Sequence, residues 1–424
     1  MSAPASSSTA PDGRGWARVL PWLLAGLAMF GPFTIDTIFP AFLQMGEDLR
    51  ADKLAMQQTI SVYLVAYALM SVVHGPLSDA LGRRRVILGG LVVFTLASIG
   101  CAMANELGTL LVFRAVQGLS AGVGVVVGRA VIRDLYQGND AQRLLSQVSM
   151  IFGIAPAIAP IIGGWILGWA RWPAIFWFLV LFSVVLLLAT WRWMPESLPV
   201  AERRSLAPRH LLRDYINIFC NARFQRLAAG GAFNFAALFL FIVSAPAFIM
   251  DLLALDENQF GWLFIPMISG MMTGAWVSGR AAGRMKGVTL ANIGFACSAV
   301  AIAANMLYYL VVDVPTVPWA VLPLVLNAFG IALVFPIVTL AILDMFPAQR
   351  GAAASLQAFT GLVLNAVVAG LLSPLVSGTG IGLASLAATF LVIGWFFWRW
   401  ETRGHRPPPQ VPAEPARYEP TEQL

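Results

Sequence analysis

The stretch Gly75-Pro-Leu-Ser-Asp79-Ala-Leu-Gly82-Arg83-Arg-Arg decides the fold, because it is a short charged loop between two long apolar runs. The flanking runs, 55–73 and 86–104, each approach the roughly 20 apolar residues that a membrane-spanning helix needs. Asp79 lies four residues before Arg83, a spacing that lets both side chains pair on one helical face. Gly75 and Gly82 permit a tight backbone turn. An ordinary basic membrane loop would need the arginines, but neither the glycines nor Asp79.

The rest of the chain repeats this alternation of long apolar runs and short polar gaps. Of its 424 residues, 58% are apolar and only 11% are charged, whereas a soluble domain carries about 25% charged residues. About twelve runs are long enough to cross a bilayer, so the sequence predicts an all-α integral membrane protein with twelve transmembrane helices. The runs are 19–45, 55–73, 86–104, 107–129, 144–169, 172–194, 227–253, 260–279, 288–312, 319–345, 352–375 and 381–397.

The longest polar gap divides the runs into two equal groups, as expected for two pseudo-symmetric six-helix halves with a solute site between them. We predict an N-terminal cytoplasmic tail (1–17), a first half (18–194), a cytoplasmic linker (195–226) and a second half (227–398). The Pro-rich, polar C-terminal tail (399–424) is expected to be disordered.

The placement of basic residues predicts the orientation in the membrane. If the N-terminus is cytoplasmic, the outer loops hold only Arg50, Lys53 and Arg171 of the 27 basic residues. This bias predicts cytoplasmic N- and C-termini. The basic inner loops also explain the net charge of +6 without a nucleic-acid partner. The expected partners are membrane lipid, protons and a small-molecule substrate. Duplicated halves favour a functional monomer.

No residue pattern in the sequence indicates an enzyme active site. The three Cys and three His residues are dispersed, and no metal-binding, nucleotide-binding or nucleophile motif is present. We therefore expect no enzymatic activity, no metal and no prosthetic cofactor. A membrane enzyme that acts on lipids remains an alternative class, but it would need a catalytic His or an acid cluster at the interface.

The charged loop at 75–85 resembles the signature loop of the major facilitator superfamily, with Ala80 where that family usually has Arg. Arg114, Gln117 and Gly118 match the superfamily's Arg-x-x-Gln-Gly pattern. In related transporters the loop forms a charge network that latches the outward-facing state. The resemblance therefore assigns gating roles to Gly75, Asp79, Gly82 and Arg83, and to Asp134 at the end of the fourth run.

The fifth run resembles the motif of the bicyclomycin-resistance (Bcr/CflA) drug:proton antiporters, in the form Ala-Pro156-x-x-Ala-Pro160-x-x-Gly163-Gly164. Each proline leaves one helical carbonyl without its donor, so this helix must bend or another group must satisfy the carbonyl. The glycine pair lets a neighbouring helix approach. The resemblance implies that these residues shape the gate of a transporter driven by the proton gradient.

Two charges, Asp36 and Arg114, lie deep within apolar runs, where a charge costs roughly 2.5–3.5 kcal/mol on insertion scales. Each is expected about 10–12 Å below the outer membrane surface. Pro40 removes the hydrogen-bond donor for the Asp36 carbonyl, and Gly31-Pro32 loosens the preceding turn, so the first helix should bend here. We predict Asp36 as the proton carrier and Arg114 as its electrostatic partner. A static ion pair, or contact with substrate alone, are the alternatives.

The remaining cavity residues are predicted from polar positions within the runs, any one of which could instead form an interhelical hydrogen bond. They are Thr59, Tyr63, Tyr67, Gln117, Asn234, Asn327 and Gln357. The sequence thus predicts proton-coupled efflux of drugs or other small amphipathic molecules. Proton-coupled uptake and a non-transporting membrane sensor of the same fold are the alternatives.

Overall fold

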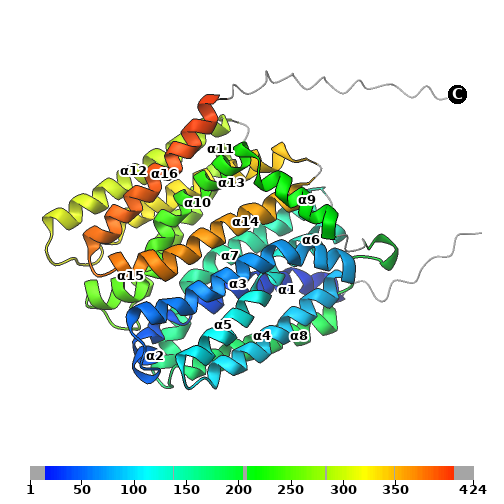
Figure 1. The fold of residues 1–424 in the computed structure, drawn as a ribbon, viewed down its shortest axis with the longest axis horizontal. Helices are drawn as coiled ribbons and strands as arrows, with labels where there is room; N and C mark the ends of the chain where they lie inside the picture. Colours follow the sequence, from blue (N-terminus) through cyan, green and yellow to red (C-terminus); the bar gives the residue numbers. More distant parts are fainter. Residues whose placement is uncertain (1–14, 137, 204–207, 282–283, 348, 405–424) are drawn as a thin grey trace, which may run out of the picture.

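The computed structural model describes residues 15–136, 138–203, 208–281, 284–347 and 349–404, and every regular element in these ranges is helical (Figure 1). The first half contains α1 (Gly15–Asp36), η1 (Phe39–Ala41), α2 (Phe42–Asp48), α3 (Lys53–Leu81), α4 (Arg83–Ala102), α5 (Leu107–Ala121), α6 (Val123–Leu135), α7 (Gly138–Leu167) and α8 (Pro173–Trp193). A connecting region holds η2 (Val200–Glu202) and α9 (Pro208–Phe219). The second half contains α10 (Ala222–Val243), η3 (Ala247–Leu252), α11 (Gly261–Ala281), α12 (Gly287–Val311), α13 (Leu322–Met345), α14 (Arg350–Val367), η4 (Val368–Leu372), α15 (Ser373–Val376) and α16 (Gly380–Gly404).

Each of the twelve predicted spans corresponds to one helix or to consecutive helices. In the described ranges, ten helices are long and apolar enough to cross a membrane. The fifth predicted span corresponds to α7, which has 30 residues, and the eighth corresponds to α11, which has 21 residues. Large apolar side chains such as Trp169, Leu310 and Leu375 are exposed on the bundle, as expected for a surface in contact with lipid. The predicted all-α integral membrane fold is therefore confirmed.

The two halves lie against each other along α3 and α14, which run side by side through the middle of the molecule (Figure 1). Helix α7 of the first half packs against α11 of the second. We call the end of the bundle where α1 begins and α16 ends the terminal face, and the opposite end the far face. The predicted orientation makes the terminal face cytoplasmic.

Helices occupy parts of two segments that the sequence assigns to a linker and a tail. The predicted linker contains a helix, α9, which packs on α10 and α14. Helix α16 extends to Gly404, past the predicted tail boundary at 399, because the buried Glu401 carboxylate accepts hydrogen bonds from Arg223 and Arg226 at 2.6 and 2.9 Å. The remainder of both predicted tails, 1–14 and 405–424, lies outside the described residues.

A repeated backbone feature supports the internal duplication. Arg50 follows α2 and Ala254 follows η3, and both have φ of 51°, a left-handed conformation that is uncommon for residues other than glycine. Each is preceded by a leucine and followed two residues later by an aspartate, Asp52 or Asp256. The connections after the first and seventh spans are thus built alike.

Candidate functional site

Asp36 is the last residue of α1, where the helix breaks completely instead of only bending as the sequence indicates. The chain continues through a turn into η1, with Pro40 in its first turn. The Asp36 side chain is buried, with 4% of the residue exposed. Within the described residues, no ion pair holds this carboxylate. A buried acid without a fixed cationic partner at a helix break is the central feature of the site.

Arg114, on α5, is fully buried and holds the broken end of α1 to α3. Its Nη1 donates a hydrogen bond to the Thr34 carbonyl on α1 at 3.0 Å. Its Nε donates to the Thr59 carbonyl on α3, also at 3.0 Å. The two carbonyls are main-chain groups, so the guanidinium works as a clamp between helices.

Gln117 supports this clamp from one turn further along α5. Its Oε1 accepts a hydrogen bond from Arg114 Nη1 at 2.9 Å, and its Nε2 donates to Ser98 Oγ at 2.8 Å. The guanidinium carbon also lies 4.7 Å from the ring centre of Tyr63, within the range of a cation–π interaction. The predicted cavity residue Gln117 is thus engaged at both ends with protein groups.

Two polar atoms of this site have no hydrogen-bond partner among the described residues: Arg114 Nη2 and the Tyr63 hydroxyl. Buried polar groups are normally paired, so these atoms mark a place where a ligand or water could bind. The predicted partnership of Asp36 with Arg114 does not take the form of a direct ion pair here. Instead Arg114 bonds to a carbonyl two residues before Asp36.

Glycines bring the surrounding helices close together. A side chain at Gly118 would collide with the Tyr63 carbonyl of α3, and one at Gly124 with the Leu27 carbonyl of α1. Gly163 of α7 lies against the Thr37 carbonyl, directly after Asp36. A Cβ at Gly164 would come within 2.6 Å of the Glu257 carbonyl in the second half. Pro156 and Pro160 lie within the same helix α7, so the predicted gate motif joins the α1 break to the opposite half.

The charged loop forms the predicted network at the terminal face. Arg83 is ion-paired with Asp79, and its Nε lies 3.1 Å from Asp134 Oδ2. Its backbone N–H donates to Glu196 Oε1 at 2.8 Å. Gly82 has φ of 100°, which a side chain would disfavour. Gly75, in contrast, lies within α3 and has open space around it.

The other predicted cavity residues are scattered over both halves. The Thr59 hydroxyl donates to the Met56 carbonyl of its own helix, and Gln357 Nε2 donates to Thr339 Oγ1 at 2.9 Å. Tyr67 is half-buried and packs on Tyr63, with ring centres 6.2 Å apart.

Two predicted cavity residues of the second half are buried amides. Asn234 lies on α10 and Asn327 on α13. Asn234 Nδ2 and both side-chain polar atoms of Asn327 have no partner in the described part of the chain. These amides, unlike Gln357, keep free hydrogen-bonding capacity.

Polar contacts between the halves near the far face involve residues that the sequence analysis did not select. Gln58 Nε2 donates to the Gly370 carbonyl at 2.8 Å, and Ser61 Oγ donates to the Ala366 carbonyl at 2.9 Å. Lys53 Nζ lies 2.5 Å from Asp251 Oδ2. The start of α3 is thereby tied to the second half. Gln58 and Ser61 are three residues apart and so lie on one helical face. This spacing could have predicted a polar face of α3 that contacts the second half.

These features together define a class of protein. A helical membrane bundle of two halves, with an acid and an arginine buried beside a helix break and glycines at the helix crossings, has the architecture of a membrane transporter.

The comparisons agree: the chain belongs to the Major Facilitator Superfamily, whose family model matches residues 22–369. It is 30% identical over 386 residues to Multidrug resistance protein D of Escherichia coli, covering 88% of this chain and 94% of the relative. It is 26% identical over 270 residues to a Bicyclomycin resistance protein homolog of Haemophilus influenzae, covering 64% and 68%. The crystal structure of a D-xylose-proton symporter covers 92% of this chain and 100% of the symporter, with a TM-score of 0.72 at 13% identity, which supports the fold.

Proposed function

We propose that this protein exports drugs or other small amphipathic molecules across the bacterial inner membrane in exchange for protons. The observation that carries the proposal is Asp36, a buried carboxylate at a helix break with no ion-pair partner in the described residues. Relatives named for multidrug and bicyclomycin resistance support the substrate class. Both termini are cytoplasmic in this proposal, the chain acts as a monomer, and no prosthetic cofactor takes part.

Asp36 carries the proton, and Arg114 is anchored to the Thr34 carbonyl, two residues before Asp36. Because the guanidinium is held by main-chain carbonyls, it does not neutralise the carboxylate directly. When Asp36 is exposed to either side in turn, it can load and release a proton. One proton supplies roughly 2.3 kcal/mol per 100 mV of membrane potential, and about 1.4 kcal/mol per pH unit.

Polar contacts tie the start of α3 to the second half near the far face. Export requires these contacts to break, so that a substrate can leave at the far face. The network of Arg83, Asp79 and Asp134, which is already formed in this structure, acts as a latch at the terminal face. Gly163 lets α7 lie close to the Thr37 carbonyl, and Gly164 lets it lie close to the second half.

The test uses inside-out vesicles with an acidic interior, a panel of drugs that includes imipramine and chloramphenicol, and a pH-sensitive dye. We expect drug-dependent proton release in the wild type and none in Asp36→Asn. The matched control is Asp313→Asn, which removes an exposed carboxylate from the connection between α12 and α13 and should leave release unchanged. Coupled release that persists in Asp36→Asn would refute the assignment of the proton carrier. Absence of release with every compound would refute drug export.

A further inference from the structure

Two adjacent glutamines of α3 bind two different helical segments of the second half near the far face. Gln57 Nε2 donates a hydrogen bond to the carbonyl of Val243, the last residue of α10, at 3.1 Å. Gln58 Nε2 donates to the Gly370 carbonyl in η4 at 2.8 Å. Both acceptors are main-chain oxygens, so these bonds hold the backbone of the second half against α3.

The two segments that the glutamines reach are also joined to each other. Ser244 follows Val243, and Ser373 follows η4. Their hydroxyl oxygens lie 2.7 Å apart, and both residues are fully buried. Gln58 is only half-buried, so a separation of the halves at the far face breaks the bonds that α3 makes and leaves the serine pair intact.

The Gly370 carbonyl depends on an external donor because of the residue that follows one turn later. In an α-helix this carbonyl would accept a hydrogen bond from the N–H of residue 374. Residue 374 is Pro, which has no N–H. Gly370 also lies in a π-helical segment, and such segments are rare and frequently occur at functional sites. Gln58 therefore supplies a donor that the helix itself lacks at this point.

The close approach of α3 to η4 requires glycine at position 370. A Cβ at this position would lie 2.5 Å from Ser61 Oγ and 3.2 Å from Gln58 Oε1. Both distances are shorter than an ordinary van der Waals contact. The glycine and the proline four residues later thus act together, since one admits the Gln58 amide and the other leaves it an acceptor.

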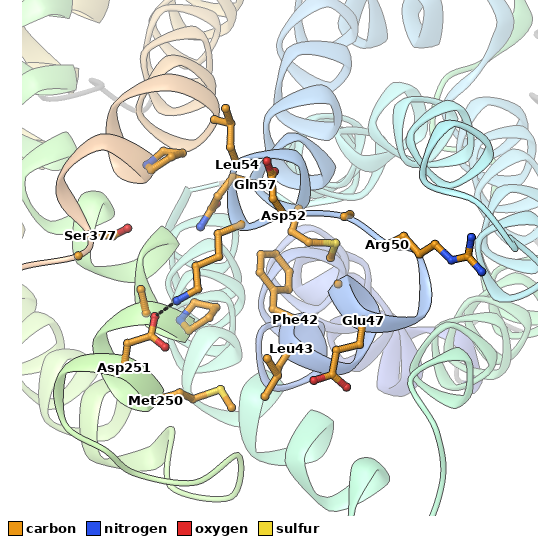
Figure 2. Close-up of a pocket in the computed structure, with 18 of the residues that line it drawn as sticks. Phe42, Leu43, Glu47, Arg50, Asp52, Leu54, Gln57, Met250, Asp251 and Ser377 are labelled. Atoms are coloured by element: carbon orange, nitrogen blue, oxygen red, sulfur yellow. Dashed lines mark hydrogen bonds and ion pairs between the residues drawn. The ribbon is translucent and has the colours of Figure 1, made fainter.

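The bond between Gln58 and Gly370 can break without leaving either group unsatisfied. Gln58 Nε2 also lies 3.4 Å from the Leu54 carbonyl, one turn earlier on α3, so the amide keeps an acceptor on its own helix. Beside the bond is a cavity of about 1,020 Å³, whose lining includes Gln57, Pro374 and Ser377 (Figure 2). Water that enters this cavity can replace Gln58 as the donor to the Gly370 carbonyl.

We propose that the hydrogen bond from Gln58 to the Gly370 carbonyl is a releasable tie between the halves at the far face, and that Pro374 sets its strength. The carbonyl is satisfied by Gln58 while the halves are together and by water when they separate. The nearby ion pair of Lys53 and Asp251 is 79% and 45% exposed in its side chains, so it contributes little. The inference rests on the proposed function in one respect, because the separation that it controls is the one through which an exported molecule leaves.

The test measures the separation of the halves at the far face in the purified full-length protein, by double electron–electron resonance. Spin labels are attached to Met103→Cys, after α4, and to Val314→Cys, after α12, which are 66% and 74% exposed in the native chain. Cys220 and Cys297 are replaced by serine, while the buried Cys101 is kept. The ratio of the long-distance to the short-distance population is recorded without drug and without a proton gradient.

Gln58→Met removes the amide donor and keeps a side chain of similar length. We expect it to raise the ratio about two- to tenfold, the effect of losing one hydrogen bond. Gln225→Met is the matched control, because Gln225 Nε2 also donates to a main-chain carbonyl, that of Phe219 at 2.7 Å, but near the terminal face. It should leave the ratio unchanged. An unchanged ratio in Gln58→Met would overturn the proposal.

Pro374→Ala distinguishes a tie from a simple packing contact. The variant supplies the missing N–H, so the Gly370 carbonyl gains a donor within its own helix and no longer depends on Gln58. We expect the ratio to rise, as in Gln58→Met, although every side chain of α3 is intact. The double variant should shift the ratio no further than Gln58→Met alone. No rise in Pro374→Ala, or additive shifts in the double variant, would also overturn the proposal.

An Asp36→Asn background separates this inference from the proposed function. The tie contains no titratable group, so Gln58→Met should raise the ratio equally in this background. A rise that requires Asp36 would overturn the inference. A rise that persists in a protein without drug-dependent proton release would support the tie and refute drug export.

Discussion

Replacing Arg114 by lysine tests whether this residue acts as a clamp or only as a positive charge. Arg114→Lys keeps the charge at the same depth. A lysine ammonium, however, presents its donors from one nitrogen, whereas the guanidinium presents a planar fork. The Thr34 and Thr59 carbonyls are bonded by different nitrogens of that fork, so lysine should lose at least one of them.

The expected cost follows from the contacts of the guanidinium. Arg114 makes hydrogen bonds of 3.0, 3.0 and 2.9 Å, and a bond to a charged group contributes about 1.5–3 kcal/mol. The contact with the Tyr63 ring adds about 0.5–2 kcal/mol. Loss of one hydrogen bond together with part of the ring contact predicts that Arg114→Lys lowers the free energy of unfolding by about 2–4 kcal/mol.

The measurement is equilibrium unfolding of the purified protein in mixed micelles, followed by tryptophan fluorescence. Arg192→Lys, at an exposed position at the end of α8, is the matched control and should change the free energy by less than about 0.5 kcal/mol. If Arg114→Lys unfolds like this control, the fork geometry has no role and the clamp is refuted.

Three further variants test other parts of the structure. Gly82→Ala should lower the free energy of unfolding by about 1–3 kcal/mol, because position 82 has a positive φ. Gly75→Ala, in the same motif, should leave it unchanged or raise it. Equal thermal midpoints of the two variants would contradict the role of the positive φ. Burial, reinforced by the nearby Asp79 carboxylate, raises the pKa of Tyr215 to about 12. Stability that depends on the neutral Tyr215 hydroxyl should therefore be lost as the pH rises above about 10. The absorbance titration of the wild type should contain one late-ionising tyrosine that is missing in Tyr215→Phe; identical titration curves above about pH 10 would contradict the raised pKa. Gly163→Ala should abolish drug-dependent proton release while the protein still inserts, because its Cβ would collide with the Thr37 carbonyl; unchanged release would show that this crossing is not part of the gate.

The sequence predicted those features that depend on periodicity or on short spacing. The twelve spans follow from apolar run length, and the Asp79–Arg83 pair follows from its spacing of four residues. Pro40 indicates an irregular first helix near Asp36, although the sequence predicts a bend where the structure has a break. These features are local, so one stretch of chain contains the whole signal.

The features that the sequence did not predict depend on partners far away along the chain or on main-chain atoms. Lys53 and Asp251 are separated by 198 residues and lie in different halves. Arg114 was expected to pair with Asp36, but its oxygen partners include two carbonyls. Since every residue has a carbonyl, no residue type in the sequence could identify them.

The attachment of Arg114 to main-chain oxygens also has an evolutionary consequence. A carbonyl is retained whatever side chain occurs at position 34 or 59, so substitutions at these positions leave the two acceptors in place. Side chains around the centre of the bundle can therefore diverge under selection by new toxic compounds, while the anchoring of the arginine is inherited unchanged. Under the proposed function, the set of exported compounds can in this way change while the anchoring of Arg114 beside the proposed proton site stays the same.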